Sequence, residues 1–351
     1  MLKRLLKYLA LFVAAIIFVA GIWALFNREL VGYGWQQLQG QLNIIRNARD
    51  IDKILEDPLA PDSLKARIRF INTVKKFAVD SLGLKESKNY TTLYDQNGRP
   101  ILWVLTASEP FEIKAYQWTF PVLGSVSYKG FFIKEKGLKE DSLLKAKGYD
   151  TDYDDVSAWS TLGWFRDPIL SNMLFRKDGQ LAELIIHEMT HATLYAKSHV
   201  DFNENLASFV GEQGAIRFLT ARDGAGSEKL SQYIHSKEDY DLFSNHMLRG
   251  KLHLDSVYVH TDTMEIEKRK TLKAAAIDSI IVNLDTLSFF NQERFKDIYK
   301  FKKPNNAYFI NFVRYDAMKK KMKMLMDRKF KGDIKAYLCL FEGKVLINIA
   351  Y

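Results

Sequence analysis

The chain begins with an apolar segment that lacks charged residues. Residues 8–26 carry no Asp, Glu, Lys or Arg. Three basic residues come just before this run: Lys3, Arg4 and Lys7. A helix needs about 20 apolar residues to cross a bilayer. We therefore predict that residues 1–30 form an N-terminal transmembrane helix that anchors the rest of the chain, residues 31–351, to a membrane.

A cleaved signal peptide is the alternative for this segment. Its apolar run is long for a signal peptide, and Ile22, Trp23 and Leu25 do not fit the small residues expected before a cleavage site. We therefore favour a retained anchor. Basic residues before the span hold the N-terminus in the cytoplasm. The rest of the chain is then extracytoplasmic, on the periplasmic side of the inner membrane if the cell is Gram-negative.

After the anchor, the spacing of apolar positions alternates between helical and strand periods. Helices are predicted at 35–57, 61–82, 167–174, 181–197 and 203–220, with several more after residue 227. Strands are predicted at 90–94, 101–106, 118–122 and 128–134, the first two joined as a hairpin through Asn97-Gly98. This order predicts an α+β fold in which helices dominate. We expect one compact domain, with a small β-sheet beside the helix at 181–197.

The helix predicted at 181–197 carries the sequence His187-Glu188-Met189-Thr190-His191, an HExxH motif. Residues four apart lie on one face of a helix, so both imidazoles can reach one cation while Glu188 lies beside them. A chance match is expected in roughly one chain in a hundred of this composition. A buried helix with two His and a Glu on one face is costly unless these groups are paired or ligated. The motif therefore predicts a Zn²⁺ site with His187 and His191 as ligands.

Catalytic zinc usually has three protein ligands and one open position. The arrangement HExxHxxGxxH is excluded, because Leu194 and Lys197 stand where it needs Gly and His. Another arrangement brings a glutamate from the following helix, and Glu204 is our candidate, with Asn203 as the N-cap of that helix. A first-turn glutamate that responds to the helix dipole is the alternative for Glu204. His199, in the predicted loop, is the rival ligand.

Glu212 lies two turns after Glu204 on nearly the same helical face. It could accept a hydrogen bond from a zinc-bound histidine, although an exposed helix carboxylate is the more common case.

Several blocks of sequence, in chain order, carry a resemblance to a known family. They are Tyr33-Gly34-Trp35-Gln36, Gly40-Gln41-Leu42, Phe120-Pro121-Val122, Tyr128-Lys129-Gly130-Phe131, Ser160-Thr161-Leu162-Gly163-Trp164-Phe165, Asp167-Pro168, the HExxH helix, Phe202-Asn203-Glu204 and Asn305-Asn306-Ala307. With these blocks the chain resembles the putative aminopeptidase family of bacterial membrane-associated zinc peptidases, which are gluzincin-like. The resemblance implies a zinc peptidase with His187, His191 and Glu204 as ligands and Glu188 as the base.

Two positions depart from the family pattern. Many members resemble lipoproteins with a cysteine after the leader, and this N-terminus has none. Ser125 stands where related chains often carry Cys. The only cysteine is Cys339, so an intrachain disulfide is excluded. Neither departure affects the metal site.

Zinc chemistry and Glu188 as general base predict hydrolysis of a peptide bond. The oxyanion formed in that reaction needs a further donor, and the sequence offers four candidates: Tyr128, Tyr308, Tyr315 and His260. An aminopeptidase also needs an acidic group for the free α-amine, and Glu109 and Glu112 are candidates. An endopeptidase, or a binding protein on a peptidase scaffold, is the alternative function.

The formal net charge is +9, and much of the basic excess lies between Lys319 and Lys331. Met residues alternate with these lysines at helical spacing, which is typical of an amphipathic helix with a solvated basic face. Contact with anionic lipid headgroups is the alternative. No nucleic-acid-binding motif accompanies the charge, so the expected partners are a peptide substrate and the membrane.

Overall fold

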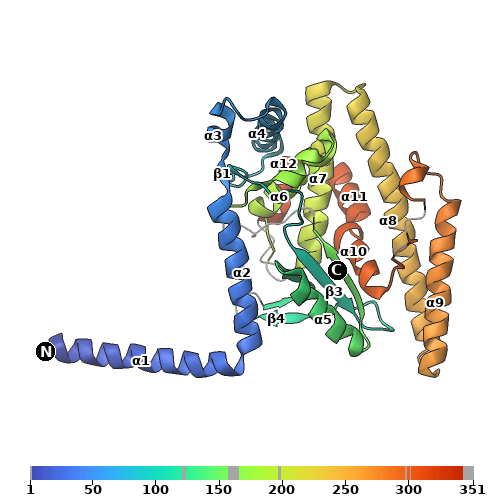
Figure 1. Ribbon diagram of the computed structural model, residues 1–351. Coiled ribbons are helices and arrows are strands. Elements are labelled where there is room, and N and C mark those ends of the chain that lie inside the picture. Colours follow the sequence, from blue (N-terminus) through green and yellow to red (C-terminus); the bar gives the residue numbers. More distant parts are fainter. Residues whose placement is uncertain are drawn as a thin grey trace. The chain divides into compact units, whose positions relative to one another are not determined.

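The computed structural model describes residues 2–120, 124–156, 166–196, 199–296, 299–300 and 302–342. The chain divides into two compact units, Met1–Ala48 and Arg49–Tyr351. Figure 1 shows that the first unit consists of helices α1 (Leu2–Phe26) and α2 (Arg28–Asn47). The boundary that we predicted from the anchor, between residues 30 and 31, falls inside α2. The anchor itself stays a prediction.

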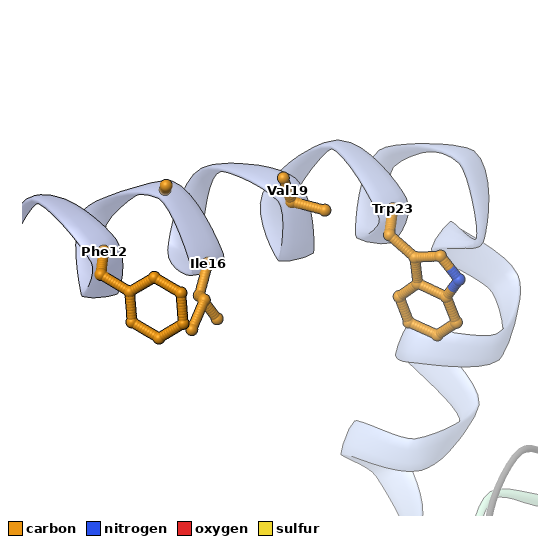
Figure 2. A pocket seen from close by; sticks show the side chains of 5 residues that line it. Phe12, Ile16, Val19 and Trp23 are labelled. Carbon is orange, nitrogen blue, oxygen red and sulfur yellow. The ribbon is translucent and has the colours of Figure 1, made fainter.

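Helix α1 exposes an apolar surface along its length. Among the described residues, it is the one helix that is long and apolar enough to cross a membrane, from Arg4 to Phe26. Phe12, Ile16, Val19 and Trp23 lie at intervals of three and four residues and line one side of it (Figure 2). Its length and composition are those of a membrane-spanning helix.

The helix predicted at 35–57 is interrupted. Its first part lies in α2, the chain then forms strand β1 (Arg49–Asp50), and a short helix α3 follows (Ile51–Glu56). Asp50 accepts a hydrogen bond from the backbone N–H of Asp52 at 2.9 Å and so caps α3. The apolar spacing continues across Asp50, so the sequence pattern did not reveal the break between α2 and α3.

In the described part of the chain, the strands form three small sheets rather than the hairpin that we predicted. Strand β2 (Thr92–Tyr94) lies between β1 and β8 (Ile169–Leu170), and β3 (Trp103–Ser108) lies between β6 (Lys129–Phe131) and β7 (Asp150–Asp155). Strand β4 (Trp118–Phe120) pairs with β5 (Gly124–Val126). The hairpin prediction is wrong because the segment after the Asn97 turn pairs with strands distant in sequence. Part of the predicted strand 118–122 lies outside the described residues.

Helices make up most of the second unit. They are α4 (Asp62–Leu82), α5 (Lys134–Ala146), α6 (Asp178–Thr193), α7 (Val200–Asp223), α8 (Glu228–His260), α9 (Ile266–Val282), α10 (Asn306–Asp316), α11 (Lys319–Phe330) and α12 (Ile334–Glu342). Short 3₁₀ helices accompany them among the described residues: η1 (Ser171–Phe175), η2 (Asn283–Thr286) and η3 (Gln292–Arg294). The helix predicted at 167–174 is instead β8 followed by η1. The α+β class, with helices dominant, is confirmed.

Two apolar cores hold these helices. In the first, α6 packs against α4, α7 and α8, and Phe218 of α7 meets Phe70 and Phe77 of α4 edge to face, with ring centroids 5.6 and 5.4 Å apart. The neighbours of α6 are thus mainly helices. The sheet of β6, β3 and β7 packs on α5, and β3 and β7 also contact α10.

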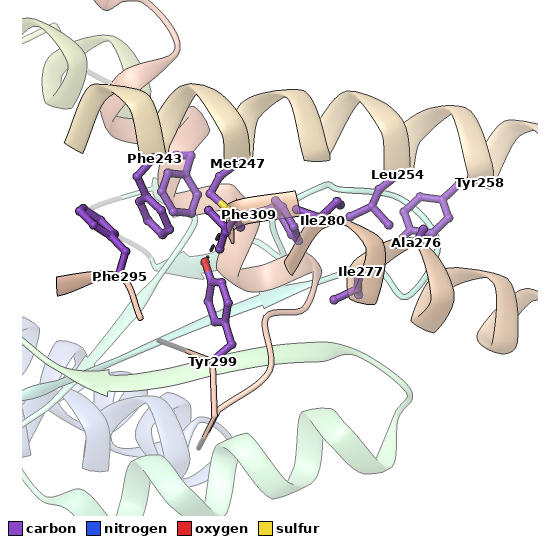
Figure 3. Packing of buried hydrophobic residues seen from close by; sticks show 12 residues of the cluster. Phe243, Met247, Leu254, Tyr258, Ala276, Ile277, Ile280, Phe295, Tyr299 and Phe309 are labelled. Carbon is purple, nitrogen blue, oxygen red and sulfur yellow. Dashed lines mark hydrogen bonds between the residues drawn. The ribbon is translucent and has the colours of Figure 1, made fainter. Parts of the chain in front are cut away.

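The second core lies between α8, α9 and α10 (Figure 3). Met247 and Leu254 of α8 are fully buried there, together with Phe309 of α10. Tyr299 donates a hydrogen bond to Met247 Sδ at 3.4 Å from the chain between α9 and α10. This core fixes α10, whose C-terminal end reaches the candidate site.

Candidate metal centre

Helix α6 carries both histidines of the HExxH motif on one face. Their Nε2 atoms are 3.1 Å apart, and the two rings meet edge to face with centroids 4.8 Å apart. The neighbouring positions Ile185, Ile186 and Met189 are buried in the first core. These apolar side chains fix the rotation of the helix and so direct both imidazoles to the same side.

Glu204 reaches the histidines from helix α7. Its Oε2 lies 3.4 Å from His187 Nε2 and 3.5 Å from His191 Nε2. The helix starts at Val200, three residues earlier than predicted, so Asn203 is not its N-cap. Instead the Asn203 side chain accepts from the N–H of Ala196 and donates to the carbonyl of Ala196, both at 2.8 Å. These two bonds hold the start of α7 beside the end of α6.

The three side-chain atoms fit a zinc ion. One ligand atom each of His187, His191 and Glu204 lies within 4.8 Å of the other two. Zinc binds N and O ligands at about 2.0–2.1 Å in tetrahedral geometry, which requires ligand atoms about 3.3–3.4 Å apart. The separations here, 3.1, 3.4 and 3.5 Å, bracket this value. The structure therefore brings the three predicted ligands together, and their role as ligands stays a prediction.

A glycine permits the close approach of α7 to α6. A Cβ atom at Gly211 would lie 2.9 Å from the backbone oxygen of Glu183 and 3.3 Å from the Cβ of His187. Gly214, one turn later, is equally close to the side chain of Ile186. The spacing between the two ligand-bearing helices thus depends on residues without side chains.

Charges in the site favour an ionised Glu204. Burial alone raises the pKa of this carboxyl, but hydrogen bonds to His187 and His191 and their charges outweigh burial and lower the pKa. At His187, burial lowers the pKa, while Glu204, Glu188 and Glu183 raise it above its ordinary value. A cluster of carboxylates around two imidazoles is an environment that favours a divalent cation.

The base predicted by the motif, Glu188, is buried beside the ligands with 7% of its surface exposed. Its Oε2 has no hydrogen-bond partner among the described residues. The Nδ1 atom of His191 likewise has none there, and the His191 ring packs edge to face on Tyr195 with centroids 6.3 Å apart. The His191 ring is therefore held by packing on its Nδ1 side and by His187 and Glu204 on its Nε2 side.

Glu212 does not accept a hydrogen bond from a histidine in the contacts of the described residues. Its carboxylate pairs with Lys319 at 2.6 Å and with Lys237 at 3.3 Å. Lys237 also pairs with Glu183 at 2.8 Å, one turn before His187. Glu212 therefore belongs to a buried ionic network that ties α6 and α7 to α8 and α11.

Two of the four candidate oxyanion donors lie near the site. Burial raises the pKa of Tyr128 to about 12, and the charges of Glu204 and Glu188 contribute to this shift. The same causes, burial first, raise the pKa of Tyr315. By contrast, Tyr308 accepts a hydrogen bond from Tyr299 in the second core at 3.4 Å.

The remaining sequence candidates are elsewhere. His260 is at the exposed end of α8 and contacts the Ser256 carbonyl at 2.7 Å. His199 precedes α7 and is exposed, outside the ligand cluster of the described residues. Glu109 and Glu112 lie in the turn after β3, where the Ser108 hydroxyl donates to the carbonyl of Glu112. The block from Ser160 to Phe165 lies outside the described residues.

Sequence reasoning missed the residues that position Tyr315. Asn205, adjacent to Glu204, donates to the Arg314 carbonyl at 2.5 Å and accepts from the Met318 N–H at 2.7 Å. Arg314 lies over the Tyr128 ring, 5.1 Å from its centroid, and donates to the hydroxyl of Ser127 at 3.1 Å. Asn205 directly follows a candidate ligand, which was a signal in the sequence that it could belong to the site. Its hydrogen-bond partners were not predictable, because they are about 110 residues away in the chain.

At the other end of α10, the block Asn305-Asn306-Ala307 has a structural role. Asn305 caps the helix by accepting from the Tyr308 N–H at 3.2 Å. Asn306 accepts a hydrogen bond from Tyr258 at 2.5 Å and donates to the carbonyl of Glu109. These contacts fix the helix that carries Arg314 and Tyr315.

Two imidazoles and a carboxylate on adjacent helices, with a second buried carboxylate beside them, are typical of metal-dependent hydrolases. The family comparison agrees with this class. The model of the family described as "Putative aminopeptidase" matches residues 32–341, and the chain belongs to this family. Membership supports a peptidase function in general. No curated protein and no solved structure matches the chain.

Proposed function

We propose that this protein is a zinc-dependent metallopeptidase, with His187, His191 and Glu204 as metal ligands and Glu188 as general base. The observation that carries the proposal is the triangle of ligand atoms with sides of 3.1, 3.4 and 3.5 Å. Its size suits tetrahedral zinc. Membership in an aminopeptidase family supports the same reaction class.

In the proposed reaction, the oxygen of water forms a bond to the scissile carbonyl carbon, and the C–N bond then breaks. When bound, zinc supplies Lewis-acid chemistry that acidifies water and polarises the carbonyl. Glu188 accepts the proton of the attacking water and passes it to the leaving amine nitrogen. The burial of Glu188 excludes bulk water that would compete for this proton.

Tyr128 and Tyr315 are the proposed donors to the oxyanion. Both hydroxyls are protonated at neutral pH, as a donor must be, because an ordinary tyrosine pKa is about 10 and burial raises the pKa of each further. Loss of one such donor lowers kcat by about 10²-fold in comparable sites. Tyr308→Phe is the matched control, since its hydroxyl is engaged with Tyr299. A loss of kcat in the control equal to that in Tyr128→Phe and Tyr315→Phe would remove the assignment.

The decisive experiment compares the full chain in detergent with its Glu188→Gln variant, with bound metal measured by elemental analysis. We expect about one zinc per chain in both, and turnover of peptides only in the wild type. The amide cannot accept the proton, whereas the ligand set is unchanged. Equal turnover by the two proteins would refute the proposed base, and equal inactivity would favour a binding protein on a peptidase scaffold.

We further propose that the enzyme is an aminopeptidase, as the family description suggests. The test uses pairs of peptides that differ only in N-acetylation. An aminopeptidase cleaves the free peptide alone, because its site must bind the α-amine. Cleavage of both at similar kcat/KM would instead identify an endopeptidase.

We also propose that α1 anchors the enzyme in a membrane with the catalytic unit outside the cytoplasm. The helix is long, apolar and preceded by basic residues. A protease added to intact spheroplasts should digest the catalytic unit and leave α1 in the membrane fraction. Protection of the catalytic unit until lysis would contradict this orientation.

A further inference from the structure

Helix α7 begins without a side-chain cap, although it carries a candidate metal ligand close to its start. Its first residue is Val200, and the side chain of His199, which precedes it, makes no capping hydrogen bond. The first N–H groups of a helix have no partner within the helix, so an uncapped start is less stable than a capped one. Glu204 is only the fifth residue of α7. A ligand at this position needs a contact outside its own helix to hold it in place.

The side chain of Asn203 supplies such a contact. Its Oδ1 accepts a hydrogen bond from the N–H of Ala196, and its Nδ2 donates to the carbonyl of the same residue, both at 2.8 Å. The two residues are buried, with 2% of Asn203 and 4% of Ala196 exposed. Two hydrogen bonds from one planar amide to one residue fix both distance and direction, and burial strengthens them. The Asn203 amide thus joins the first turn of α7 to the segment that follows α6.

This pair of hydrogen bonds lies between the candidate ligands along the chain. His191 comes five residues before Ala196, and Glu204 directly follows Asn203. Adjacent side chains of an α-helix point about 100° apart, so a fixed Asn203 also fixes the direction in which Glu204 leaves α7. In that direction Glu204 Oε2 lies 3.4 Å from His187 Nε2 and 3.5 Å from His191 Nε2. The separation between carboxylate and imidazoles therefore depends on the link to Ala196.

We propose that Asn203 is a positioning residue for the metal: by binding Ala196 it holds the first turn of α7 and keeps Glu204 at coordinating distance from the two histidines. The oxygen and the nitrogen of its amide both face Ala196, so Asn203 orients a ligand and is not one itself. Loss of a residue that orients a metal ligand typically lowers metal affinity 10- to 100-fold. The inference rests on the zinc site of the proposed function.

The test compares Asn203→Ala with Asn306→Ala in the full chain in detergent. Asn306 is the matched control, because its amide is also buried and hydrogen-bonded, to Tyr258 at 2.5 Å and to the Glu109 carbonyl at 2.9 Å. Competition with a chelator gives the zinc dissociation constant, and thermal unfolding of the metal-free proteins gives the stability lost. Both variants should lose stability, since each leaves buried polar groups unpaired. Only Asn203→Ala should weaken zinc binding, by about 10- to 100-fold.

Wild-type zinc affinity in Asn203→Ala, or an equal loss of affinity in Asn306→Ala, would overturn the proposal. Asn203→Ser is the second variant, because its hydroxyl keeps a smaller polar group in the buried position, and it should also bind zinc more weakly than the wild type. Failure of both Asn203 variants to fold would overturn the proposal as well, because the fold itself would then require the amide. A wild-type chain that binds no zinc would instead refute the proposed function, so the two failures are distinguishable.

Discussion

Gly211 lies where the two helices that carry the candidate metal ligands approach each other, and its replacement by alanine gives a quantitative prediction. The new Cβ would lie 2.9 Å from the Glu183 backbone oxygen, whereas ordinary contacts begin at 3.4 Å. Backbone atoms of a helix cannot rotate away, so α7 must move from α6 by about 0.5 Å, the difference of these distances. Glu204 moves with α7, while His187 stays on α6.

A displacement of this size exceeds the tolerance of about 0.2 Å in zinc–ligand distances. We expect Gly211→Ala to weaken zinc binding at least tenfold. Stability changes less, because alanine gains about 1 kcal/mol of helix propensity while overpacking costs about 1–3 kcal/mol. Gly250→Ala is the control: its Cβ would meet Ile280 at 2.9 Å between α8 and α9, in the second core.

The assay is competition for zinc with a chromophoric chelator, with thermal unfolding of each metal-free protein measured in parallel. Gly250→Ala should lose stability and retain its zinc dissociation constant. If Gly211→Ala bound zinc as tightly as the wild type and gained about 1 kcal/mol from its helix propensity, the helix spacing would not set the geometry of the site.

Three further predictions follow from buried or charged groups. Burial raises the pKa of Asp316 from 3.8 to about 6. Between these two pH values the folded protein holds one more proton than the unfolded chain, so its stability falls as the pH rises through them. Asp316→Asn should therefore be more stable than wild type at pH 7.5 by on the order of 1–3 kcal/mol and equally stable at pH 3.5, and a pH-independent difference would contradict this. Asn205→Ala leaves two buried backbone groups unpaired, so it should lower the free energy of unfolding by about 2–4 kcal/mol and also lower kcat. Replacement of the exposed Asn245 by Ala is the control and should change neither quantity. Equal unfolding midpoints for the two variants would contradict this prediction. If the exposed face of α11 binds anionic lipid, a chain without α1 should sediment with anionic but not with zwitterionic vesicles at low salt. The double variant Lys320→Glu, Lys321→Glu should abolish this sedimentation. Solubility that does not depend on salt would exclude lipid binding by α11.

The sequence predicted the helices and the metal candidates because both follow from local spacing. The i, i+4 relation of His187 and His191 depends on one helix, and the following helix brings Glu204 back to the same place. The start of α7 was misplaced because Asn203 hydrogen-bonds to Ala196 instead of capping the helix, a choice that spacing does not reveal.

The sheets and the surroundings of the site could not be predicted in the same way. Strand β3 pairs with β7 about 50 residues later, and Asn205 binds the carbonyl of Arg314, 109 residues later in the chain. Such pairings depend on tertiary packing, and the Asn97-Gly98 signal for a hairpin was overridden by them. The left-handed backbone of Tyr90, with a φ angle of +62°, was not predictable either, because no sequence pattern encodes it for a tyrosine.

All three ligand candidates come from one pair of consecutive helices, with Glu204 only 17 residues after His187 (204 − 187). The chain entropy lost when so short a loop closes is small, so the pair can form soon after it is synthesised. If the chain is exported and binds zinc, as we propose, this pair of helices can bind the metal before α8 to α12 assemble. Early capture would give those later helices a preformed surface on which to fold.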